Sequence, residues 1–263
     1  MQTENSKSIL FITGAFVSNE SWNEWIEFYE NRGYKTIAPA WPFKDAPTSV
    51  LRSRHPDPKV ASIRFAQLIA HFEEIARSFS EKPIIIGHSI GGLIAQILNQ
   101  KGLASAVVAI HSVPPQGILT FKLSFLKAGW GPLGFFTPTK ETFLMSFSQW
   151  QYAFANGMQL ELQEKGYLQL AIPESKLVVR DTITSVAKVD FKKNHHPLLL
   201  IAGDMDHTIP HQLNYDNYKK YTDKNSVTDY KVFPGRNHFV LGQPGWQEIA
   251  IYILEWIQKH KND

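Results

Sequence analysis

The sequence predicts an α/β protein with a mostly parallel central sheet and helices on both of its faces. Three observations support this fold class. Short apolar runs, such as ILFITGA at 9–15, have the unbroken hydrophobicity of strands that are buried on both sides. Between these runs, apolar residues recur at the spacing of one helical face. Strands and helices also alternate along the chain, which favours an open sheet with right-handed crossovers.

The chain begins with a predicted strand, helix and strand. The strand at 8–15 precedes a helix that we expect to start at a capping box formed by Ser21 and Glu24. The apolar face of this helix has the spacing i, i+3, i+4, i+7 and consists of Trp22, Trp25, Ile26 and Tyr29. Gly33 ends the helix, and the next strand is expected at 34–41.

A polar loop then leads to the second pair of predicted helices. Asp57 is expected to cap a helix with Pro58 at its first position. This helix should bury Phe65, Leu68, Ile69, Phe72, Ile75 and Phe79. A buried strand at 83–87 follows, and a helix at 91–100 ends at Gly102.

The remaining core elements lie in two parts of the chain. We expect strands at 104–112, 197–203 and 227–235, followed by a C-terminal helix. The apolar stripe of that helix consists of Trp246, Ile249, Ala250, Ile253 and Ile257. These elements predict one core made of residues 1–113 and 197–263.

Residues 114–196 interrupt the alternation and are predicted to form a helical lid, or cap. The segment is helical in pattern, has no convincing core strand and is rich in Phe, Trp and Tyr. Connections of this length usually have their own structure and often cover an active site. Most of the aromatic residues are expected to pack within the cap, and Trp130 is a candidate for the wall of a substrate pocket.

The composition excludes several classes of protein. No run approaches twenty apolar residues, and the polar start MQTENSKS lacks the features of a secretory signal. The chain has no cysteine, which rules out disulfides and thiolate chemistry. The net charge of +3 is scattered along the chain, so we expect no nucleic-acid partner. We expect a cytoplasmic protein without integral membrane association, whose oligomeric state the sequence does not indicate.

A serine between glycines is the strongest chemical signal. The stretch PIIIGHSIGG at 83–92 places Ser89 between a predicted strand and a predicted helix, which is the setting of a nucleophile elbow. Small neighbours such as Gly87 and Gly91 permit the strained turn that such an elbow requires. The start of the helix also offers backbone N–H groups where an oxyanion would develop. Ser89 is therefore the candidate nucleophile.

A serine nucleophile needs a base and an acid that orients the base. His238 follows the last predicted strand, at the sheet edge where catalytic groups gather. The stretch LIAGDMDHTIP at 200–210 supplies two candidate acids directly after a strand, Asp204 and Asp206. His111 ends its own strand, where it either lines a pocket or is a buried core histidine.

These motifs resemble those of the α/β-hydrolase superfamily, in particular serine hydrolases of the esterase and lipase type with a lid insertion. GHSIGG at 87–92 is similar to the elbow, AGDMDHTIP at 202–210 to the acid loop, and GRNHF at 235–239 to the histidine loop. The acid-loop pattern Gly-x-x-Asp-x-x-x-Pro selects Asp206 over Asp204. The resemblance covers 8–113 and 197–260 and implies the α/β-hydrolase fold.

The resemblance also implies an oxyanion hole. By the match, the backbone N–H groups of Ala15 and Ile90 would form it. Thr13 stands where relatives usually have a histidine, and this departure changes a side chain but no backbone donor. Phe16 matches a pocket-wall position. The full set of residues expected to line the substrate pocket is Phe16, His88, Val113 and Trp130.

The predicted activity is hydrolysis of an ester or related acyl bond of a small to medium apolar substrate, through an acyl-enzyme and without a cofactor or metal. Other chemistries of the same triad remain alternatives: C–C bond hydrolases, lactonases, cofactor-free haloperoxidases and, with least support, hydroxynitrile lyases. A serine at the elbow argues against haloalkane dehalogenase and epoxide hydrolase activity. The alternative of a different class is a ligand receptor that keeps the fold without turnover.

Overall fold

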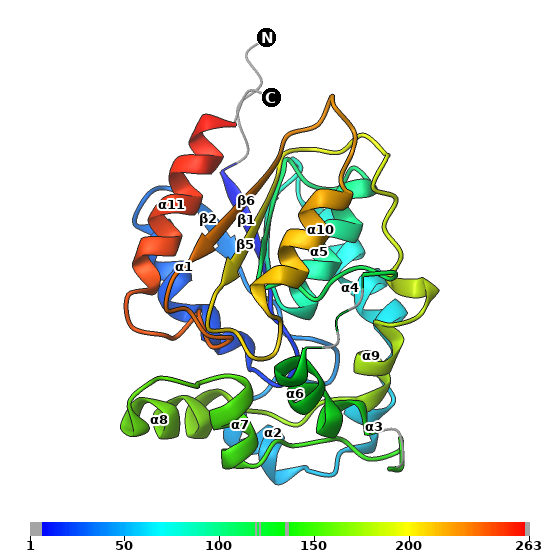
Figure 1. The fold of residues 1–263 in the computed structure, drawn as a ribbon, viewed down its shortest axis with the longest axis vertical. Helices are drawn as coiled ribbons and strands as arrows, with labels where there is room; N and C mark the ends of the chain where they lie inside the picture. The colour runs from blue at the N-terminus through cyan, green and yellow to red at the C-terminus, as the bar shows by residue number, and fades with distance from the viewer. Residues whose placement is uncertain (1–6, 119, 121, 135–136, 261–263) are drawn as a thin grey trace.

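Six strands form one central sheet in the part of the chain that the computed structural model describes, residues 7–118, 120, 122–134 and 137–260. Every neighbouring pair of strands is parallel (Figure 1). Across the sheet, the order is β2 (Lys35–Ile37), β1 (Ser8–Ile12), β3 (Ile84–His88), β4 (Ala106–Ile110), β5 (Leu198–Gly203) and β6 (Thr228–Phe233). The predicted parallel sheet is confirmed.

The order in which the chain adds strands to the sheet changes sides between β1 and β3. The chain first adds β2 on one side of β1 and then returns to add β3 to β6 on the other side. Loops diverge at such a point and leave a crevice at the carboxyl ends of the two strands. The register pairs Ile12 of β1 with Gly87 of β3, and His88 with Ile110 of β4. The residues that follow these strands therefore meet at one edge of the sheet.

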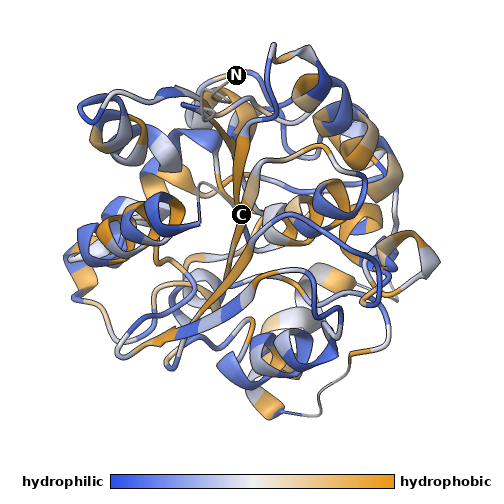
Figure 2. Cartoon of the chain, turned by 90° about the horizontal axis from the view of Figure 1, so that it is seen from above, coloured by the Kyte–Doolittle hydropathy of each residue, from blue (hydrophilic) through white to orange (hydrophobic). Residues whose placement is uncertain are grey.

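Helices cover both faces of the sheet, as predicted (Figure 1). One face carries α1 (Asn23–Glu30) and α11 (Trp246–Lys259), and the other carries α4 (Phe65–Ser78), α5 (Ile90–Gln100) and α10 (His211–Lys220). Each face has its own apolar core. Figure 2 shows hydrophobic strands at the centre and hydrophilic residues on the outer sides of the helices. Among the described residues, no helix has the length and hydrophobicity needed to cross a membrane.

A second group of helices lies at one end of the sheet. The chain between β4 and β5 forms α6 (Leu123–Leu133), α7 (Phe147–Ala153), α8 (Leu160–Leu170), α9 (Lys176–Asp181) and the short η2 (Ser185–Ala187). Figure 1 shows α2 (Thr48–Ser53) and α3 (Pro58–Ala61) at the same end. The guanidinium of Arg52 in α2 donates to the carbonyl oxygen of Tyr167 in α8 over 3.1 Å. Two helices from the first half of the chain thus join this layer.

The prediction of a single helix after Asp57 is wrong, because the chain forms two helices there, α3 and α4. Asp57 does cap α3, with its carboxylate accepting from the amide of Lys59 over 2.9 Å. The helix is interrupted between α3 and α4 because Ser175 Oγ donates to the carbonyl oxygens of Ala61 and Ile63. These partners come from a distant part of the sequence, so local patterns do not reveal the break.

Two boundaries near the start of the chain also differ. The strand expected at 34–41 is only β2, Lys35–Ile37, because Pro39 has no amide hydrogen to continue the ladder. The capping box at Ser21 and Glu24 is wrong. Ser18 is the cap instead, and its side chain accepts from the amide of Glu20 at the start of the 3-10 helix η1 (Asn19–Trp22), which precedes α1.

Candidate active site

Ser89 lies at a sharp turn between β3 and α5. Its backbone φ of 56° is in the left-handed region, which costs free energy for a residue other than glycine. A Cβ atom at Gly87 would lie 2.1 Å from the carbonyl oxygen of Gly91, and a Cβ at Gly91 would lie 2.1 Å from that of Ile12. Only glycine permits these close approaches. The turn therefore has the geometry that the Gly-x-Ser-x-Gly motif predicts.

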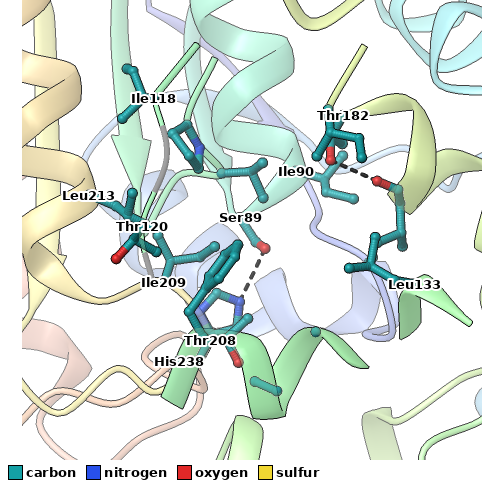
Figure 3. Close-up of a pocket in the computed structure, with 18 of the residues that line it drawn as sticks. Ser89, Ile90, Ile118, Thr120, Leu133, Thr182, Thr208, Ile209, Leu213 and His238 are labelled. Atoms are coloured by element: carbon teal, nitrogen blue, oxygen red, sulfur yellow. Dashed lines mark hydrogen bonds between the residues drawn. The ribbon is translucent and has the colours of Figure 1, made fainter. Parts of the chain in front are cut away.

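The structure brings together Ser89, His238 and Asp206, which come from three different strand ends. Oγ of Ser89 lies 3.1 Å from Nε2 of His238 (Figure 3). Nδ1 of His238 lies 2.8 Å from Oδ2 of Asp206. All three residues are buried. This is the hydrogen-bonded arrangement in which an imidazole can accept a proton from a serine hydroxyl while a carboxylate orients the ring.

Asp204, the other candidate acid, has a different environment. It is exposed, and its Oδ1 accepts from the amide of Gly235 over 2.7 Å. This contact links the loop after β5 to the loop after β6. Asp204 thus supports the turn, and Asp206 is the carboxylate that contacts His238.

Four hydrogen bonds hold the Asp206 carboxylate. Oδ1 accepts from the amides of Thr208 and Ile209, over 2.8 and 2.7 Å. Oδ2 accepts from His238 and from Nδ1 of His111, each over 2.8 Å. Burial alone would raise the pKa of Asp206, but the two imidazoles outweigh it and lower the pKa from 3.8. The carboxylate is therefore ionised at neutral pH.

Two further histidines surround this group. His111 is fully buried, with φ of 46°, and burial lowers its pKa despite the opposing effect of Asp206. Nε2 of His88 donates to the backbone carbonyl of His238 over 3.0 Å, and burial lowers the pKa of His88 well below 6.5. Both rings are therefore neutral at pH 7. The sequence signal for His111 was its place at a strand end, but nothing local showed its contact with Asp206.

The loop after β1 lies beside Ser89. Ala15 and Ile90 both line the cavity that contains Ser89. Ile90 is the first residue of α5, so its amide has no acceptor within the helix. Thr13 is buried, and its Oγ1 accepts from Nε1 of Trp22 over 3.0 Å. The threonine that replaces the usual histidine therefore contacts the aromatic core of the α1 face.

A cavity of about 200 Å³ leads to Ser89. Its walls are mostly apolar and come from the segment after β4, from α6 and α9, from residues on either side of α7, and from the loop after β5 together with α10 (Figure 3). The apolar lining residues include Phe16, Val113, Ile118, Phe125, Leu133, Met145, Phe154, Val179, Ile209 and Leu213. The polar lining residues are Ser89, His238, Gln116, Thr120, Thr182 and Thr208. Such a site suits an apolar group attached to one polar reacting centre.

Of the four residues expected to line the pocket, Phe16 and Val113 do so. His88 does not, because its ring is buried beneath the elbow against the His238 backbone. Trp130 does not either, since its side chain is 71% exposed on the outer side of α6. The helix presents Ala128 to the cavity instead.

Imidazole nitrogens and a carboxylate oxygen are possible metal ligands, and three such groups lie close together here. Within the described ranges, ligand atoms of His111, Asp206 and His238 lie within 4.8 Å of one another. The two Nδ1 atoms already face Oδ2 of Asp206 at hydrogen-bond distance, so each must carry a proton. A metal ligand must be deprotonated. The two Nδ1 atoms and Oδ2 are therefore engaged in hydrogen bonds and are not available to a metal ion.

Solved structures of known proteins resemble the chain over nearly its whole length. Tomato methylketone synthase I superposes with a TM-score of 0.70 at 17% identity, covering 97% of this chain and 99% of that one. A monoacylglycerol lipase from Paleococcus ferrophilus gives 0.67 at 16%, covering 96% and 94%. A methylesterase from Arabidopsis gives 0.63 at 16%, covering 95% and 98%. At these identities the likeness shows the fold. No curated protein sequence matches the chain.

The fold and the elbow define an α/β protein of the hydrolase class, and the sequence agrees. The model of the alpha/beta hydrolase family matches residues 9–247, and the chain belongs to this family. The resemblance found in the motifs is thus confirmed, and membership supports hydrolase activity.

Proposed function

We propose that the protein is a serine hydrolase that cleaves an ester or related acyl bond of an apolar substrate through an acyl-enzyme. The observation that carries this proposal is the buried chain of hydrogen bonds from Ser89 through His238 to Asp206, at the inner end of an apolar cavity. The substrate class is a small molecule, and no nucleic acid is involved.

In the proposed first half-reaction, Ser89 Oγ attacks the carbonyl carbon of the substrate. Nε2 of His238 takes the hydroxyl proton, and the carbonyl oxygen becomes an oxyanion. The amides of Ala15 and Ile90 stabilise this oxyanion, while Asp206 stabilises the imidazolium. The intermediate collapses, the C–O bond to the leaving alcohol breaks, and His238 gives that alcohol its proton.

In the second half-reaction, water replaces the alcohol. His238 takes a proton from the water as it attacks the acyl carbon, and the same amides bind the second oxyanion. The C–O bond to Ser89 breaks, His238 returns the proton to Oγ, and the carboxylic acid leaves. Each group thus returns to its starting state.

The apolar walls favour an acyl chain, or another apolar group, over a charged substrate. We assign residues 114–196 to a cap because α6, α9 and the residues Met145 and Phe154, which flank α7, supply much of the wall. Tomato methylketone synthase I, a structural neighbour, was solved with 2-tridecanone, which has a long alkyl chain. This likeness supports an apolar substrate here.

The test combines a fluorophosphonate probe, which phosphonylates active serines, with p-nitrophenyl esters from acetate to decanoate. Wild type should be labelled and should turn over some of the esters. Ser89→Ala should lose labelling and about 10⁶ in kcat. Unlabelled, inactive wild type would overturn the proposal and favour a receptor role. Turnover that survives in Ser89→Ala would show that Ser89 is not the nucleophile.

A further inference from the structure

A buried ion pair lies next to the candidate oxyanion loop, and the proposed mechanism does not use it. Nζ of Lys44 is 2.5 Å from Oε2 of Glu174, and the two side chains are 5% and 0% exposed. Lys44 belongs to the loop after β2 and also lies over the ring of Trp41, 3.8 Å from its centroid. Charged side chains are rarely buried so completely, because removing them from water costs several kcal/mol each, on the order given by continuum estimates.

The third member of this group is a backbone amide. The N–H of Phe16 donates to the same Oε2 of Glu174 over 3.3 Å. Phe16 follows Ala15 directly, and its φ is 67°, which a phenylalanine rarely adopts. The other oxygen, Oε1, accepts from the amide of Ser175 over 2.9 Å. Both oxygens of the Glu174 carboxylate therefore accept hydrogen bonds. One of the donors is the backbone of Phe16, a strained residue next to Ala15.

The chain around Glu174 also pairs with the chain around Phe16. The amide of Ile172 donates to the carbonyl oxygen of Phe16 over 3.0 Å, and the amide of Ser18 donates to that of Leu170 over 2.9 Å. An antiparallel bridge joins Val17 to Ala171. These contacts locate the loop, and the Glu174 contact fixes the Phe16 peptide within it.

Lys44 supplies the positive charge that a buried carboxylate requires. Without it, Glu174 would be an unpaired charge in an apolar setting, which is strongly unfavourable. With it, Glu174 can accept the Phe16 N–H as an ionised group, and such hydrogen bonds are stronger than neutral ones.

We propose that Glu174, held by Lys44, is a positioning residue that fixes the backbone of Phe16 and thereby directs the Ala15 N–H toward the oxyanion. This inference rests on the proposed function. Glu174 itself touches no reacting atom. Its effect should appear where negative charge develops on oxygen and should be small in substrate binding.

Two double variants isolate the Phe16 contact. Lys44→Met with Glu174→Gln removes both charges but keeps a side-chain oxygen for the Phe16 amide. Lys44→Met with Glu174→Leu removes the charges and the acceptor. The thermal midpoint of each is measured first, and both are assayed below the lower one, so that a difference in folding does not enter the comparison.

The readouts are kcat and KM for a p-nitrophenyl ester, and inhibition by an alkyl trifluoromethyl ketone. Ser89 Oγ adds to the carbonyl carbon of this ketone, its proton passes to His238, and the carbonyl oxygen becomes an oxyanion like that of the reaction. We expect the Leu variant to lose at least about 10-fold in kcat and in inhibitor affinity, with KM within about twofold. The Gln variant should stay within about threefold of wild type in both.

Exchange of the Phe16 amide with solvent, followed by NMR, gives a readout that does not depend on activity. It should be faster in the Leu variant than in the Gln variant. Equal kcat, inhibitor affinity and exchange in the two variants would overturn the positioning role. A wild type that the fluorophosphonate does not label would overturn the proposed function instead, and the exchange rates would then decide whether Glu174 holds the loop.

Discussion

His111 and His238 donate to the same oxygen atom, Oδ2 of Asp206, and each of their Nδ1 atoms lies 2.8 Å from it. Only His238 also contacts Ser89. Oδ2 of Asp206 thus accepts one hydrogen bond from a ring that contacts the nucleophile and one from a ring that is fully buried and does not. This arrangement makes the acid–base behaviour of the site depend on His111 as well.

Replacing His111 should change the pH dependence of catalysis. In His111→Phe, Oδ2 has one donor fewer, so more of its charge is available to stabilise the His238 imidazolium. The acid limb of the pH profile of kcat/KM should therefore move to higher pH. His111→Asn is the matched control, because its side-chain amide can replace Nδ1–H and asparagine tolerates the left-handed backbone. Its pH profile should stay like that of wild type. An unchanged profile in the Phe variant would contradict this coupling.

The two aspartates of the loop after β5 should differ sharply in their effect on turnover. Asp206→Asn removes the charge that orients and stabilises the imidazolium, and kcat should fall by about 10⁴. Asp204→Asn serves as the matched control, because Asp204 is exposed and contacts the amide of Gly235. We expect it to retain activity within a few fold. Initial rates on one p-nitrophenyl ester suffice, and a larger loss at Asp204 would reverse the assignment.

The sequence predicted the residues that follow directly from strand ends. Ser89 and Asp206 follow the buried apolar strands β3 and β5, and His238 follows β6, whose residues are mostly half-buried. Parallel strands bring their carboxyl ends to one edge of a sheet. Short motifs with a local geometric reason, such as the glycines around Ser89, are therefore readable without a structure.

Contacts between distant segments were not predictable in this way. Glu174 and Lys44 are 130 residues apart, and neither belongs to a motif. The richness of residues 114–196 in aromatic side chains predicts Trp130 in the pocket wall, but the rotation of α6 turns it to the outside. The rotation of a helix against its neighbours depends on tertiary packing, which periodicity alone does not determine.

Filling the cavity at α6 should shorten the preferred substrate. Ala128 is buried and lines the cavity, so Ala128→Phe should exclude the far end of a long acyl chain. Each excluded methylene should lower kcat/KM by about fourfold, from the ~0.8 kcal/mol gained by burying it. Trp130→Ala, on the outer side of the same helix, should leave the chain-length profile as it is. The ester series from acetate to decanoate measures both variants, and a profile unaltered by Ala128→Phe would place the acyl chain elsewhere.

Acid should destabilise the fold in a window that begins near pH 6.5. Burial lowers the pKa values of His88 and His111, so the unfolded chain binds more protons than the native one once the pH falls below about 6.5. Their contribution to stability is therefore complete above that pH and is lost as the pH decreases. The pKa of Asp206 is also lowered, and its contribution is lost at still lower pH, below about 3.8. All three groups thus act in the same direction.

Urea unfolding at pH 7.5, 6.5, 5.5 and 5.0 tests this expectation. The free energy of unfolding of wild type should fall over this range. In His88→Gln, whose amide can still donate to the His238 carbonyl, one of the groups that takes up a proton on unfolding is gone. The slope of the free energy of unfolding against pH should then decrease by up to about 1.4 kcal/mol per pH unit below pH 6.5. Equal slopes in the two proteins would show that burial does not keep His88 neutral in the native state.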